Sequence, residues 1–156
     1  MSGGGSGTVV TADRLVGSWE GNFQLADEFR SQSTVTRGVH GTLVFVQARR
    51  GLTGFPDMAA PLHYGLYDID FSPYGFDSRV TGVVPTAIAR TLPTPASEAD
   101  SVFIVLDPER RGVIVLMRGQ LLGDRADGVW TAVSSTRSGI GESGSFVMTR
   151  ARSAHK

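Results

Sequence analysis

The chain contains no cysteine, which excludes disulfides, thiolate metal sites and a cysteine nucleophile. It also has no apolar run near the roughly 20 residues that a membrane-spanning helix needs. The N-terminus lacks the basic and then apolar layout of a signal peptide. We therefore expect a soluble chain, and its compartment stays open between the cytoplasm and export with the leader removed.

An excess of charge of either sign is absent too, because 15 Lys and Arg residues balance 15 Asp and Glu residues. The adjacent arginines at 49–50 and 110–111 are isolated pairs, and no basic stripe is available to follow a phosphate backbone. Nucleic acid is therefore not an expected partner. Hydrophobic residues make up 40% and charged residues 19% of the 156 residues, which predicts a folded chain of single-domain size.

Helical periodicity is also missing beyond a turn or two, whereas alternation with a period of two is frequent. In GSWEGNFQL (17–25), Trp19, Gly21, Phe23 and Leu25 share one parity, and the residues of the other parity are polar. This pattern is typical of a strand that buries one face and exposes the other.

Seven further segments have strand-like patterns, separated by turn-forming residues. They are 38–48, 61–71, 82–91, 101–106, 112–122, 127–135 and 144–151. Short connections predict antiparallel neighbours, and pairing the first strand with the last removes both sheet edges. The predicted fold is an all-β, antiparallel, up-and-down β-barrel of eight strands. We expect one domain at 11–152, preceded by a flexible Gly- and Ser-rich segment (1–10) and followed by a tail (153–156).

Both ends of the chain carry a family resemblance. LVGSWEGNF near the start and GSFVMTRAR near the end resemble the barrel-closing strands of the calycin superfamily, which includes the lipocalins and lipocalin-like bacterial domains. The segment GQLLGDRADGVWTAV resembles the penultimate hairpin of those bacterial domains, with Trp130 as its tryptophan. The resemblance implies that Trp19 lies at one end of the barrel and that Arg150 packs across its indole. A guanidinium over an indole face contributes roughly 0.5 to 2 kcal/mol.

An eight-stranded barrel of this kind either packs its interior with side chains or holds one small ligand. The leading hypothesis is a non-enzymatic, lipocalin-like protein that binds a small apolar or amphipathic molecule in its lumen. Its expected ligand contacts are Tyr64, Tyr67, Tyr74, Phe76 and Arg118. No catalytic residue, metal or cofactor is expected. The predicted lining of the interior is Trp19, Phe23, Leu43, Phe45, Tyr64, Leu66, Ile104, Val115, Met117, Trp130, Phe146 and Met148.

The polar residues of 63–77 support a less favoured enzymatic hypothesis. Asp68 and Asp70 share one strand face, where they could bind a cation or act as an acid–base pair in a barrel isomerase or cyclase. His63 points to the opposite face, which disfavours a His–Asp pair. We expect the two carboxylates to be exposed in water, and His63 and His40 to be partly exposed strand residues.

Several segments are apolar on both parities: LVFV, VFIVL and VIVLM. A monomeric barrel with a wet exterior should alternate instead. We therefore expect a homo-oligomer, or a protein partner, to cover the outer walls of 101–106 and 112–122. The alternative function is accordingly a packed barrel that serves as an accessory or assembly subunit through its apolar outer strands.

Overall fold

The computed structural model describes residues 15–26, 38–46, 63–76, 78–79, 81–93, 99–108, 113–134 and 140–151. The predicted N-terminal segment (1–10) and the tail (153–156) lie outside these residues. Within the described ranges, no helix has the length and hydrophobicity that a membrane span requires.

Eight antiparallel strands form a closed barrel in which every strand pairs with the next one along the chain. The strands are β1 (Gly17–Leu25), β2 (Val39–Val46), β3 (His63–Ile69), β4 (Thr86–Pro93), β5 (Asp100–Leu106), β6 (Val113–Leu122), β7 (Arg125–Ser134) and β8 (Ile140–Arg150). A single turn of 3-10 helix, η2 (Ser72–Tyr74), follows β3. The predicted all-β, up-and-down, eight-stranded barrel is therefore confirmed.

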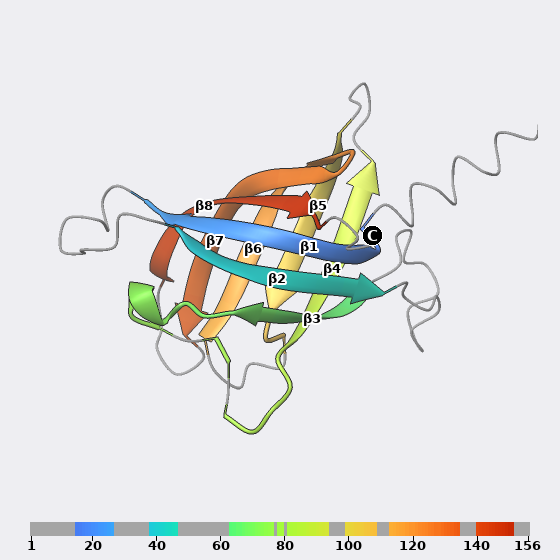
Figure 1. The fold of residues 1–156 in the computed structure, drawn as a ribbon. Helices are drawn as coiled ribbons and strands as arrows, with labels where there is room; N and C mark the ends of the chain where they lie inside the picture. The colour runs from blue at the N-terminus through green and yellow to red at the C-terminus, as the bar shows by residue number, and fades with distance from the viewer. Residues whose placement is uncertain are drawn as a thin grey trace, which may run out of the picture.

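The first and last strands close the ring. β1 pairs with β8 from Trp19 opposite Arg150 to Leu25 opposite Gly144, and its other edge pairs with β2. Figure 1 shows β1 (blue) between β8 (red) and β2 (teal). This closure removes the two free edges that an open eight-stranded meander would expose.

Glycines lie opposite large residues on neighbouring strands of the barrel. Gly21 lies opposite Met148 and Gly128 lies opposite Phe146. Gly41 and Gly65 lie opposite Ile69 and Phe45 on the β2–β3 ladder. The side chains of Ile69 and Phe45 occupy space that a Cβ on Gly41 or Gly65 would need, so these two glycines allow close packing.

The ladder between β3 and β4 is shorter than that between β2 and β3. β3 pairs with β4 only from His63 to Leu66, whereas it pairs with β2 as far as Ile69. Pro85 ends the ladder because it lies directly before β4 and has no N–H to donate. Its carbonyl oxygen instead accepts a hydrogen bond from the Tyr67 amide (3.2 Å). A notch therefore remains in the barrel wall beside the second half of β3.

Candidate functional site

One end of the barrel is built around Trp19 and Arg150. The guanidinium carbon of Arg150 lies 4.5 Å from the centroid of the Trp19 ring, which is completely buried. The Trp19 indole N–H donates to the carbonyl oxygen of Leu15 (2.9 Å). Arg150 also donates to the Val16 carbonyl oxygen (2.7 Å) and to the Asp124 carboxylate (2.9 Å). The guanidinium thus joins β8 to the start of β1 and to the β6–β7 turn.

Gly17 leaves room for this guanidinium. Its φ is +126°, a backbone angle that residues with a Cβ rarely adopt. In addition, a Cβ at this position would lie only 2.7 Å from Nη1 of Arg150. The Gly-x-Trp pattern at 17–19 therefore has two physical reasons: the backbone conformation and the space for the arginine.

Aromatic side chains fill the opposite end of the interior. Phe71 is the N-cap of η2 and Tyr74 is its last residue, and both pack against Trp130. The rings of Tyr74 and Trp130 are nearly parallel, 6.1 Å apart, and Phe76 stacks on Phe71 at 5.0 Å. The Tyr74 hydroxyl donates to the Phe23 carbonyl oxygen (2.7 Å). The structure thus brings two of the predicted ligand contacts together: Tyr74 belongs to the buried core, and the partly buried Phe76 packs against it.

Tyr67 also points inward and is buried. Its hydroxyl donates to the carbonyl oxygen of Ser78 and lies 2.9 Å from the Ser78 hydroxyl. This contact ties β3 to the segment that follows η2. Tyr67 thus holds the backbone of the residue that precedes Arg79.

Tyr64 and Arg118 lie on the outer surface of the barrel, and so does Leu66. The prediction that Tyr64 and Leu66 line the interior is wrong, because the inward parity of β3 is that of His63, Tyr67 and Ile69. Arg118 likewise belongs to the outward parity of β6, between the buried Met117 and the half-buried Gly119. Every other predicted lining residue is buried.

His63 lies on the inner face of the barrel wall, whereas Asp68 and Asp70 lie on the outer face. His63 is only 1% exposed, so the expectation of partial exposure is wrong for this residue, whereas His40 is exposed. Asp68 and Asp70 point outward, away from His63, with side chains 84% and 54% exposed. Hydrogen bonds from the Ser72 backbone and hydroxyl lower the pKa of Asp70, and the Arg79 charge adds to this effect. A lowered pKa does not suit a general acid.

An outer apolar row crosses five strands without a break. We use this name for Val46, Tyr64, Ile88, Val105 and Leu116, each of which is the register partner of the next. Val46, Tyr64 and Leu116 are 55%, 41% and 44% exposed. Three of its members, Val46, Val105 and Leu116, are outward-facing residues of the segments that are apolar on both faces.

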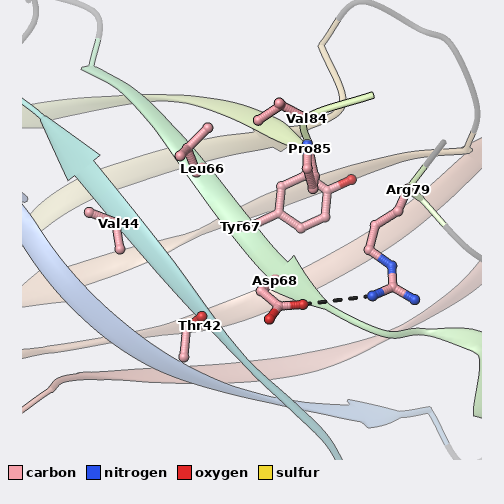
Figure 2. Close-up of a pocket in the computed structure, with 8 residues that line it drawn as sticks. All are labelled: Thr42, Val44, Leu66, Tyr67, Asp68, Arg79, Val84 and Pro85. Carbon is pink, nitrogen blue, oxygen red and sulfur yellow. Dashed lines mark ion pairs between the residues drawn. The ribbon is translucent and has the colours of Figure 1, made fainter. Parts of the chain in front are cut away.

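An outer groove lies at the notch beside β3. It has a volume of about 390 Å³ and is lined by Thr42, Val44, Leu66, Tyr67, Asp68, Arg79, Val84 and Pro85. Figure 2 shows Val44 and Leu66 side by side on β2 and β3, with the Asp68–Arg79 ion pair at the other end. Two features of the sequence point to this site. Pro85 interrupts a strand-like segment, and β2 has apolar residues on its outer face as well as on its inner face. No such feature points to Arg79, which a loop brings to Asp68.

Within the described residues, no group of three or more His, Asp or Glu side chains could hold a metal ion. Comparison of the chain with protein-family models, curated proteins and solved structures finds no match.

Proposed function

We propose that this protein is a non-enzymatic assembly module: a packed, calycin-like barrel that associates through its outer wall. The observation that carries the proposal is the unbroken outer apolar row from Val46 to Leu116. Exposed apolar patches of this kind mark interaction surfaces in soluble proteins. The buried aromatic cluster of the interior supports the same choice, because Phe71 and Trp130 pack against each other there and leave a lumen ligand to compete with core contacts.

The proposed occupant of this wall is a second copy of the chain. Val46, Tyr64 and Leu116 are each about half exposed, so burying the remainder contributes about 1 kcal/mol per side chain. Two copies together gain about 6 kcal/mol, which is comparable with the 4–15 kcal/mol cost of association. We therefore expect weak, concentration-dependent association rather than a permanent dimer.

Sedimentation velocity between 10 and 500 µM tests this proposal. The wild-type chain should shift to a larger weight-average sedimentation coefficient as the concentration rises. Leu116→Lys should remain monomeric, because it places a charge in the outer apolar row. The control Thr149→Lys adds the same charge at an exposed position of β8 and should behave like the wild type. A wild-type chain that stays monomeric throughout would overturn the proposal.

A ligand in the lumen is the weaker candidate. Large rings such as Phe71 and Trp130 are fully buried in the interior and pack against each other at 5.9 Å, which does not favour an open lumen. An isomerase or cyclase gains no support from Asp68 and Asp70, because both carboxylates face water and share Arg79.

A further inference from the structure

Among the described residues, two carboxylates and one guanidinium lie at the open end of the outer groove: Asp68 and Arg79 in its lining, and Asp70 beside it. Asp68 and Asp70 face one guanidinium, that of Arg79, at nitrogen–oxygen distances of 3.7 and 3.4 Å. Both distances exceed the roughly 2.7–2.9 Å of a charge-assisted hydrogen bond. Asp68 is the more exposed of the two carboxylates. Its oxygens therefore keep the capacity to accept hydrogen bonds from a second cation.

The rest of the groove is apolar. Val44 and Leu66 form its floor on β2 and β3, and Val84 and Pro85 form its wall. Leu66 and Val84 are 51% and 60% exposed, so apolar surface is available to a ligand. The volume of about 390 Å³ lies near the lower end of the roughly 300–1,000 Å³ range of ligand pockets. A short hydrocarbon group therefore fits the groove better than a long lipid chain does.

We propose that the outer groove binds a small amphipathic cation: an ammonium carried by a short hydrocarbon group. The hydrocarbon lies between Val44, Leu66 and Val84, and the ammonium donates to the Asp68 carboxylate. Asp68 and Arg79 line the groove, and Asp70 lies beside it on the same guanidinium. An anion would meet both carboxylates there, so the charges at this end favour a cation. The site lies on the outside of the barrel, and the inference does not depend on self-association.

Nitrogen-15 NMR of the full chain, kept dilute, tests the proposal with three probes of equal chain length: hexylammonium, hexanoate and 1-hexanol. Hexylammonium should cause saturable shifts at the amides of Val44, Leu66 and Asp68. Hexanol should bind about two- to fivefold more weakly, which is the range that an exposed ion pair supplies, and hexanoate more weakly still.

Single substitutions test which charged side chain contributes to the affinity for hexylammonium. Asp68→Asn should weaken hexylammonium binding about two- to fivefold, and Arg79→Gln should strengthen it by releasing the carboxylates from a competing cation. The control Asp127→Asn removes a half-exposed carboxylate from β7, four strands away, and should change nothing. Unchanged shifts elsewhere in the spectrum establish that each variant is folded.

Three results would overturn the proposal. Tighter binding of hexanoate, lost in Arg79→Gln, would make the groove an anion site. Equal affinity for all three probes would make it an apolar surface without charge recognition. Shifts at Val44 and Leu66 that never saturate would leave no specific site at all.

Discussion

The guanidinium of Arg150 lies 4.5 Å above the Trp19 ring while donating to Val16 and Asp124. Arg150→Ala removes the cation–π contact and two charge-assisted hydrogen bonds. We expect it to lower the free energy of unfolding by about 2 kcal/mol, measured by urea denaturation. The control Arg125→Ala removes an exposed ion pair with Asp127 and should cost less than about 1 kcal/mol. Equal losses in the two variants would show that the closure contact adds no stability.

Gly119 and Gly128 are cross-strand partners on β6 and β7 that approach too closely for a Cβ. A Cβ on Gly128 would collide with the Arg118 carbonyl oxygen, so Gly128→Ala should cost about 1–3 kcal/mol of unfolding free energy. Gly75→Asn is the matched control, because Gly75 adopts a left-handed conformation with no atom near its would-be Cβ. Asparagine tolerates that conformation, so this variant should unfold within about 1 kcal/mol of the wild type.

Tyr74→Phe tests the contact that ties η2 to β1. The change removes the buried hydrogen bond from the Tyr74 hydroxyl to the Phe23 carbonyl oxygen but keeps the ring stacked on Trp130. We expect a loss of about 1 kcal/mol in thermal or urea unfolding. Tyr64→Phe removes an exposed hydroxyl on β3 and should stay within about 0.5 kcal/mol of the wild type. A Tyr74→Phe variant as stable as Tyr64→Phe would contradict the described contact.

Asp70 should make the free energy of unfolding depend on pH in the acid range. Its pKa is lowered in the folded chain, chiefly by the hydrogen bond from the Ser72 amide. Its contribution is therefore present above the unfolded pKa of about 3.9 and is lost as the pH falls through the lower folded value. Asp70→Asn should be less stable than the wild type at pH 7. The difference in unfolding free energy between the two should disappear below about pH 4. A difference that is constant from pH 7 to pH 3 would mean that the charge of Asp70 plays no part.

The alternation of GSWEGNFQL predicted β1 without error. The up-and-down order followed from the short connections late in the chain and from pairing the first strand with the last. Local patterns decide such features, because strand faces repeat every two residues. The inward parity of β3 was harder to predict, because apolar and polar residues occur on both of its faces. The expectation of Tyr64 inside and His63 partly exposed failed for this reason.

The outer groove could be anticipated only in part. A proline in a strand-like segment, such as Pro85 in 82–91, suits an edge or a bulge, but the depth of the notch depends on where the β3–β4 ladder ends. Arg79 reaches Asp68 and Asp70 because Tyr67 holds Ser78, a contact between residues eleven positions apart in the sequence. Long-range side-chain contacts of this kind leave no periodic signal in a sequence. Whether the lumen is packed or holds a ligand could likewise not be predicted from the sequence, because barrels of this size do either.

We propose that recognition takes place on the outer wall of the barrel and not in its interior. Methyl carbon-13 NMR tests it most directly, by titration of the chain with the apolar dye 1-anilinonaphthalene-8-sulfonate. Met117 and Met148 report on the interior, and Val105 and Leu116 report on the outer apolar row. We predict that the methyl signals of Val105 and Leu116 shift while those of Met117 and Met148 stay unchanged. Saturable shifts at Met117 and Met148, with the outer methyls unaffected, would contradict the claim and place the binding site in the lumen.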